Sequence, residues 1–234
     1  MKLTVLGKYG PYPQDRDSAC SGYLIEQDDT KLLIDCGPGT LGRLLSTIDI
    51  RNLNAIYLTH LHYDHTSDLL TMGYLLDDLN LTIPVYTKLT GKDYEKILFS
   101  NKHFKAIDIN GSSNIKIGCL NLAFMKMDHP LVNHGVLIKG DVNLGITGDT
   151  KYCENVVTLA KKSDYLLADC SKPTGFKGPH MGAEYAFKII NETNTTILAT
   201  HVTPNSEVDL FSKEKRIIPV EELKTYILNG KSKA

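Results

Sequence analysis

The chain has 234 residues, of which 42% are hydrophobic and 23% charged. This composition is typical of a globular core and excludes a largely disordered chain. The 26 basic and 27 acidic residues give a formal net charge of −1, so the overall charge indicates no broad nucleic-acid-binding surface.

Short runs rich in leucine and β-branched residues alternate with stretches of helical period, which predicts alternating strands and helices. The expected strands are residues 3–6, 23–26, 31–36, 55–59, 83–86, 121–127, 136–139, 143–147, 165–169 and 196–200. The expected helices are residues 41–48, 66–80, 91–99, 154–161, 182–191 and 220–228. Hairpins at the start and in the middle, each followed by βα units, predict an α/β class with helix-covered sheets. Because no linker rich in Pro, Gly or Ser divides the sequence, we expect a single domain over residues 1–234.

The five cysteines are scattered, odd in number and without a C-x-x-C pair. This usage disfavours a secreted disulfide framework and predicts a reducing, cytoplasmic location. No apolar run approaches the roughly 20 residues that cross a bilayer, so we expect no membrane partner.

The most informative segment is Thr59-His60-Leu61-His62-Tyr63-Asp64-His65. It follows an expected strand, and α/β folds bind their ligands at such strand ends. Its three imidazoles and one carboxylate suit zinc and similar borderline metals. A helix cap needs only one such side chain, so this loop indicates a metal site and can offer two ligands to each of two ions.

Three later residues are further candidate ligands, because each lies just past an expected strand: His129, Asp149 and His201. We expect them to converge with the His loop at one sheet edge. His134 competes with His129 for the role of third histidine. His129 is preferred because it lies at the strand exit before Pro130, whereas His134 adjoins the next strand.

With these residues in this order, the sequence resembles the metallo-β-lactamase fold superfamily. The resemblance includes Asp35 after an early strand, and it is closest to the ribonuclease Z-like phosphodiesterase branch. The segments behind that branch are Ser21–Ile25, His129-Pro130, Thr147–Thr150 and His180-Met181-Gly182-Ala183-Glu184. The resemblance implies an α/β fold built as a four-layer αββα sandwich, with two mixed β-sheets flanked by helices.

The resemblance also implies residue roles around two divalent ions. The first ion takes His60, His62 and His129; the second takes Asp64, His65 and His201; and Asp149 bridges both. Asp35 would brace the His loop, because carboxylates behind ligands fix their orientation. The ions are expected to be Zn²⁺, although Mn²⁺ or iron also suits nitrogen and oxygen ligands.

Such a binuclear centre predicts a hydrolase that uses metal-activated hydroxide, most simply a phosphodiesterase. Asp64 is the expected catalytic partner of that hydroxide as well as a ligand. His180, at the start of the 182–191 helix, is the candidate general acid for the leaving alkoxide. Lys172 and Lys177 are expected to be solvated surface lysines, with contact to a substrate phosphate as the alternative.

The expected substrate is a small molecule or short phosphodiester. The segment between Asp149 and His180 has no room for the transfer-RNA-binding arm of ribonuclease Z, so transfer-RNA processing is not expected. Another RNA stays open as an alternative substrate. A homodimer is expected only from the family.

Three alternatives stay open at this point. The same site suits a thioester, lactone or β-lactam hydrolase, or a relative that binds metal without catalysis. Residues 37–42 also match the dinucleotide-binding pattern G-x-G-x-x-G. That match is disfavoured because Pro38 lacks an N–H and the next strand ends in His60 instead of an acidic residue.

Overall fold

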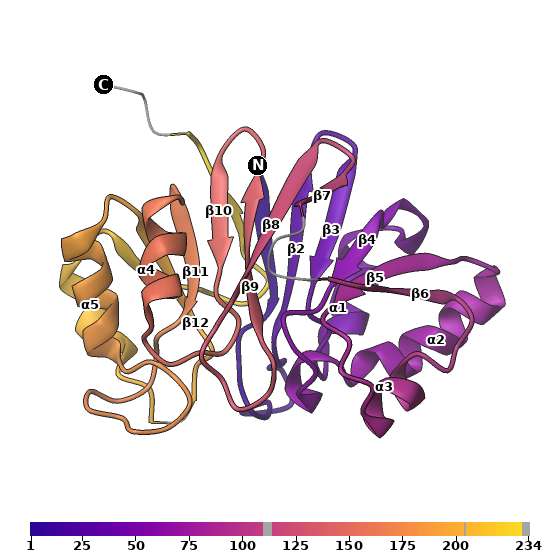
Figure 1. Cartoon of the computed structure of the whole chain (residues 1–234), viewed down its shortest axis with the longest axis horizontal. Helices are drawn as coiled ribbons and strands as arrows, with labels where there is room; N and C mark the ends of the chain where they lie inside the picture. The colour runs from indigo at the N-terminus through magenta and orange to yellow at the C-terminus, as the bar shows by residue number, and fades with distance from the viewer. Residues whose placement is uncertain (110–113, 204, 231–234) are drawn as a thin grey trace.

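The computed structural model describes residues 1–109, 114–203 and 205–230. Two seven-stranded sheets pack against each other, and helices cover the outer face of each sheet (Figure 1). The expected α/β class and four-layer αββα sandwich are confirmed.

The first sheet has the order β14-β1-β2-β3-β4-β5-β6. It is antiparallel from β14 to β3 and parallel from β3 to β6. Its strands are β1 (Lys2–Gly7), β2 (Gly22–Gln27), β3 (Thr30–Ile34), β4 (Ala55–Tyr57), β5 (Ile83–Thr87), β6 (Phe104–Asp108) and β14 (Thr225–Ile227). Its helices are α1 (Thr40–Thr47), α2 (Asp68–Leu79) and α3 (Asp93–Leu98), with short 3₁₀ turns at Ile50–Asn52 and Tyr63–His65.

The second sheet has the order β13-β12-β11-β10-β9-β8-β7. It is antiparallel from β7 to β10 and parallel from β10 to β13. Its strands are β7 (Asn114–Ile117), β8 (Leu120–Lys126), β9 (His134–Lys139), β10 (Asn143–Ile146), β11 (Tyr165–Asp169), β12 (Thr196–Thr200) and β13 (Ile217–Pro219). The helices of this half are α4 (Glu154–Lys161) and α5 (Ala183–Glu192), followed by a 3₁₀ turn at Val208–Lys213.

Three layers of apolar side chains hold the sandwich together. The middle layer joins the two sheets, and within it the rings of Tyr57 and Phe124 lie 5.1 Å apart. The outer layers join the first sheet to α1, α2 and α3, and the second sheet to α4 and α5. Central strands are buried on both faces, which explains why they appear in the sequence as continuous apolar runs. Leu32-Leu33-Ile34 is one example.

The prediction of a helix over residues 220–228 is wrong. Thr225–Ile227 forms β14, which pairs antiparallel with β1 at the edge of the first sheet. Leu223 turns the chain into this strand with a φ of 60°. Strands β6, β7 and β13 were not expected from the sequence, because each is short and lies at or next to a sheet edge.

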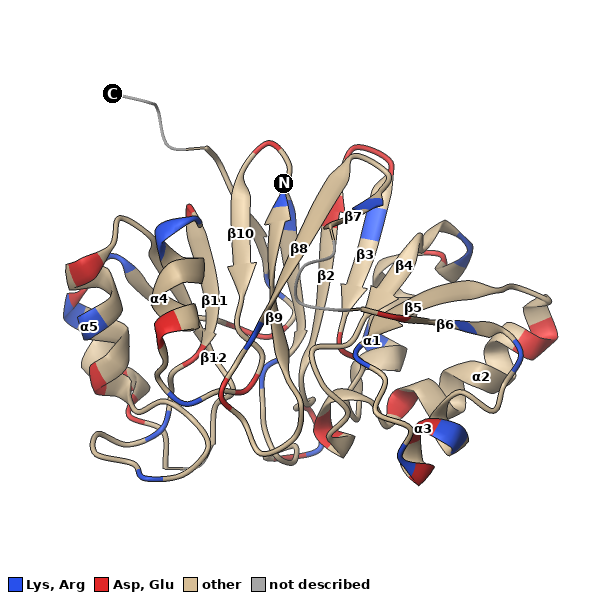
Figure 2. Cartoon of the chain, in the orientation of Figure 1, with Lys and Arg blue, Asp and Glu red and all other residues tan. Residues whose placement is uncertain are grey.

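Charged residues of both signs are interspersed over the two halves (Figure 2). In the part of the chain that the structure describes, no helix is long and apolar enough to span a membrane.

Candidate metal centre

The predicted ligands meet where the two sheets adjoin, at one end of their strands. The His loop follows β4, and Asp35 follows β3 in the first sheet. Asp149 and His201 follow β10 and β12 in the second sheet, and His129 follows β8. Residues far apart in the sequence therefore come together because five strands from both sheets end at this edge.

The His loop is held by close backbone packing and by Asp35. A Cβ atom on Gly37 would lie 1.9 Å from the carbonyl oxygen of Asp64, so only glycine allows this approach. The Asp35 carboxylate accepts hydrogen bonds from the Thr59 amide at 2.8 Å and from His65 Nδ1 at 2.7 Å. These bonds turn the His65 Nε2 atom toward Asp149, 3.3 Å away.

One set of ligand atoms comes from His60, His62, His129 and Asp149, which all lie within 4.8 Å of one another. His62 Nδ1 is 2.9 Å from His60 Nε2 and 3.2 Å from His129 Nε2. An ion bound tetrahedrally at about 2.0 Å from each nitrogen would separate them by roughly 3.3 Å. The observed spacing therefore fits a single ion held by three imidazoles.

A second set comes from Asp64, His65, Asp149 and His201, again within 4.8 Å. His201 Nδ1 lies 3.1 Å from Asp149 Oδ1. Asp149 belongs to both sets, and its other oxygen is 3.6 Å from His60 Nε2. The arrangement places a shared carboxylate between two groups of ligands.

The chemistry of these donors fits a metal. Burial lowers the pKa of His60 and of His201 well below the ordinary value, which favours the neutral ring that binds a cation. Although burial opposes it, His201 and His65 hold the pKa of Asp149 well below its ordinary value. His65 Nε2 is buried and has no hydrogen-bond partner among the residues that the structure describes, so it is available to bind an ion.

His180 lies beside this cluster and is paired with a residue that sequence reasoning missed. Its Nδ1 is 2.7 Å from Oδ2 of Asp169, the last residue of β11. Burial raises the pKa of Asp169 to about 6, although His180 opposes the rise. Burial also disfavours the charged form of His180, but Asp169 outweighs it and raises the His180 pKa above its ordinary value. The pair thus favours a proton on His180.

The expectation that Lys172 is a solvated surface lysine is wrong. Only 7% of the residue is exposed. Burial lowers the pKa of its ammonium group, and Asp169 and Asp149 partly offset this effect. Lys172 Nζ has no hydrogen bond or ion pair among the described residues and lies 5.9 Å from the centre of the Phe176 ring. A largely covered lysine, whose ammonium group still reaches solvent, therefore lies close enough to Asp169 and Asp149 to interact with their charges.

His134, the competitor of His129, is outside both ligand sets. It begins β9, and its carbonyl oxygen accepts a hydrogen bond from the Tyr57 hydroxyl at 2.5 Å. The structure brings His129 to the cluster and keeps His134 in the sheet.

The sequence matches the beta-lactamase superfamily domain over residues 30–202. YhfI of Bacillus subtilis, a probable metallo-hydrolase, is 28% identical over 229 residues, which cover 93% of each chain. Its crystal structure matches with a TM-score of 0.87 at 25% identity, over 96% of this chain and 98% of that one.

Two further comparisons extend the similarity to a ribonuclease Z and to a diphosphatase. A ribonuclease Z of Methanopyrus kandleri is 30% identical over 138 residues, 57% of this chain and 49% of its own. The crystal structure of a diphosphatase from the PhnP family shares the fold, with a TM-score of 0.78 at 15% identity, over 97% of this chain and 98% of that one. The expected resemblance to the metallo-β-lactamase fold and to ribonuclease Z is therefore confirmed.

Proposed function

Because the chain belongs to the beta-lactamase superfamily, we propose that it is a metal-dependent hydrolase of phosphodiesters. The observation that carries this proposal is the His180–Asp169 pair beside the ligand cluster, at a distance of 2.7 Å. Expulsion of an alkoxide requires a proton, and no group committed to a metal can easily supply it. The name of one relative, a ribonuclease Z, points to the same class of substrate, and that of a structural neighbour, a diphosphatase, points to phosphoryl substrates more broadly.

One divalent ion would be held by His60, His62 and His129. The other would be held by Asp64, His65 and His201, and Asp149 would contact both ions. Two such ions, with zinc as the first choice and Mn²⁺ or iron as alternatives, lower the pKa of water and polarise the phosphoryl group. Asp64 would accept a hydrogen bond from the attacking hydroxide and orient it. His180 then donates its proton to the leaving oxygen, while Asp169 holds the ring in place through Nδ1.

Lys172 favours an anionic substrate over a neutral lactone or thioester. Its ammonium group has no hydrogen bond or ion pair among the described residues and interacts with the charges of Asp169 and Asp149. A phosphodiester brings a negative charge that this cation can bind, whereas a neutral acyl substrate offers it no opposite charge. Two further features favour a small substrate. The net charge of the chain is close to zero, and the short segment between Asp149 and His180 contains only α4, β11 and a loop.

The test compares metal content and turnover for the wild type, His62→Ala and His180→Ala. Two substrates are needed: bis-p-nitrophenyl phosphate, which has a good leaving group, and glycerophosphocholine, which must expel an alkoxide. We expect His62→Ala to lose metal and activity on both substrates. His180→Ala should keep its metal and lose about 10²–10⁴-fold on glycerophosphocholine, with a smaller loss on the nitrophenyl ester.

His134→Ala serves as the control, because it removes a buried histidine that lies outside the cluster. A metal-loaded wild type that hydrolyses thioesters or lactones but neither phosphodiester would contradict the proposal. Equal losses on both diesters in His180→Ala would remove only the general-acid role.

A further inference from the structure

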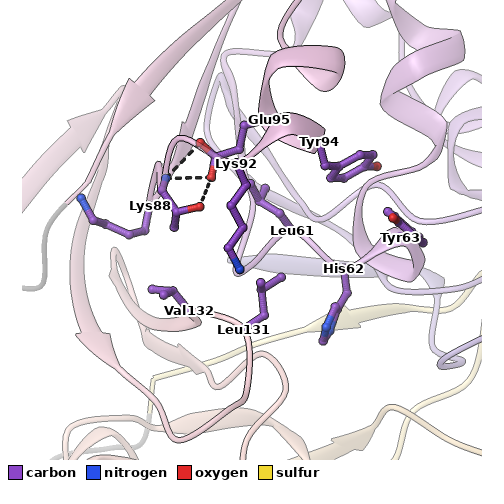
Figure 3. Close-up of a pocket in the computed structure, with 10 residues that line it drawn as sticks. Leu61, His62, Tyr63, Lys88, Lys92, Tyr94, Glu95, Leu131 and Val132 are labelled. Carbon is purple, nitrogen blue, oxygen red and sulfur yellow. Dashed lines mark hydrogen bonds between the residues drawn. The ribbon is translucent and has the colours of Figure 1, made fainter.

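A cavity of about 200 Å³ opens next to the metal ligand His62. Its walls come from three segments: the His loop, the loop from Lys88 into α3, and the turn before β9 with Leu131 and Val132 (Figure 3). His62 therefore lines both the cavity and the ligand cluster. A group attached to a phosphoryl at the cluster would lie close to this cavity.

Most of the wall is apolar, and one end is aromatic. Leu61, Leu131 and Val132 line one part of the cavity. At the other end the rings of Tyr63 and Tyr94 meet edge to face, with their centres 4.9 Å apart. The Tyr94 hydroxyl is fixed by Thr66 at 2.8 Å, so the pair is held before any ligand arrives. A flat, apolar ring fits such a wall.

Three charged side chains line the cavity, and two of them are already occupied. Lys88 Nζ is paired with Asp108 at 2.8 Å. Glu95 accepts hydrogen bonds from the amides of Thr90 and Gly91, each at 2.7 Å. Lys92 is the remaining charge, and among the described residues its ammonium group has no ion pair. Figure 3 shows its side chain extending between Leu61 and Leu131.

We infer that this cavity binds one ester arm of the substrate, a planar apolar ring that carries an anionic substituent matched to Lys92. The inference rests on the proposed phosphodiesterase function and specifies its substrate class. The phosphoryl group lies at the ligand cluster, the ring packs against Tyr63 and Leu131, and the second negative charge reaches Lys92. Ring and charge thus select among phosphodiesters that all share the reacting group.

The test measures binding by calorimetry on the metal-loaded protein, with phosphonates that are not hydrolysed. Methylphosphonate reports on the phosphoryl site alone, phenylphosphonate adds the ring, and 4-carboxyphenylphosphonate adds the second charge. We expect phenylphosphonate to bind about tenfold more tightly than methylphosphonate. The carboxylate should add about three- to fivefold, as expected for a partly exposed ion pair.

Two pairs of variants separate the ring from the charge. Tyr63→Ala should lower the preference for phenyl over methyl to about threefold, whereas Tyr74→Ala should leave it unchanged. Both tyrosines are exposed, at 68% and 77%, but only Tyr63 lines the cavity. Lys92→Met should abolish the gain from the carboxylate. Lys96→Met, one turn further along in α3 and paired with Asp93, should keep it.

Equal affinities of the wild type for phenyl- and methylphosphonate would overturn the inference, even if the enzyme hydrolyses phosphodiesters. A carboxylate gain that survives in Lys92→Met would overturn the assignment of the second charge. If none of the three phosphonates binds, both the inference and the proposed function fail. Tight methylphosphonate binding without ring preference would contradict the inference alone.

Discussion

Asp169 lies behind His180 in the way that Asp35 lies behind His65. In both cases a strand-end carboxylate accepts a hydrogen bond at 2.7 Å from the Nδ1 atom of a histidine. Such a bond fixes both the tautomer and the direction of the ring. In the proposed mechanism Asp169 acts through His180, as a positioning residue, and its removal should affect the proton transfer more than the metal.

We expect Asp169→Asn to lower turnover of glycerophosphocholine by about 10–10²-fold at unchanged metal content. The amide keeps the size of the side chain but removes the charge that favours a proton on His180. On bis-p-nitrophenyl phosphate the loss should be smaller, because that leaving group needs little protonation. The measurement is steady-state turnover together with metal analysis of the same samples.

Asp164→Asn is the matched control. Asp164 lies just before the first residue of β11, and its carboxylate accepts a hydrogen bond from the Asn143 backbone N–H at 2.8 Å. Loss of bound metal in Asp169→Asn would contradict a role that runs through His180 alone.

The sequence predicted the cluster at the residue level better than it predicted the residues around it. The imidazoles and carboxylates at positions 60–65 are unusual enough to be recognised from their spacing. Asp169 was missed because a single aspartate at the end of a strand is a common turn residue. Its only signal was the one it shares with Asp35 and Asp149, a carboxylate directly after an apolar strand. Lys172 was misjudged because its burial depends on the fold of the loop around Phe176.

The elements that close the first sheet come from opposite ends of the chain. Arg43 on α1 joins them through Glu222, with Nη1 and Oε1 2.6 Å apart, and both side chains are 15% exposed. The same arginine donates to the carbonyl oxygens of Leu6 and Asp17, and Glu222 accepts from the Ala19 amide at 2.9 Å. One ion pair therefore ties α1, β1 and the turn before β14 together.

Arg43→Met should lower the free energy of unfolding by about 2 kcal/mol, because it leaves Glu222 without its partner in a poorly solvated place. The loss stays below that of a fully buried pair since some water reaches both groups. Urea unfolding followed by circular dichroism measures the difference. Arg51→Met removes an exposed pair with Asp49 and should change stability by less than about 0.5 kcal/mol. Similar values for the two variants would contradict the argument.

Helices and strands were predictable where the pattern of burial is regular. They were not predictable where pairing at the edge of a sheet determines the conformation. The helices near residues 66–80 and 182–191 occur as α2 and α5, within a few residues of the expected limits. Residues 220–228 contain good helix formers, Glu221, Glu222 and Lys224. That local preference is overridden because β1 offers unpaired backbone groups, which Thr225–Ile227 satisfies.

In the whole molecule, the ligand cluster joins the two sheets. Asp64 and His65 come from the first sheet, and Asp149 and His201 from the second. Four carboxylates, Asp35, Asp64, Asp149 and Asp169, are buried within this region. Cations bound there would offset their desolvation and link the two halves of the sandwich.

Metal binding should therefore stabilise the whole fold. At a free metal concentration of about 100 times Kd the gain is about 2.7 kcal/mol. For a chain of this size that raises Tm by about 5–10 °C. We expect a chelator to remove the shift and added Zn²⁺ to restore it, as measured by differential scanning calorimetry.

Asp149→Asn provides the comparison, because it alters the shared carboxylate and should make Tm nearly insensitive to the chelator. A wild-type Tm that does not respond to removal and return of the metal would contradict a site that joins the two sheets.

The distance along the chain between the His loop and His201 has a consequence for biosynthesis. A nascent polypeptide released by the ribosome only as far as β11 already carries His60, His62 and Asp149, but it lacks the last imidazole of the cluster. If His201 is a ligand as proposed, hydrolysis must wait until translation has passed this residue and β12 has joined its neighbours. A nascent chain that stops before β12 would then be inactive.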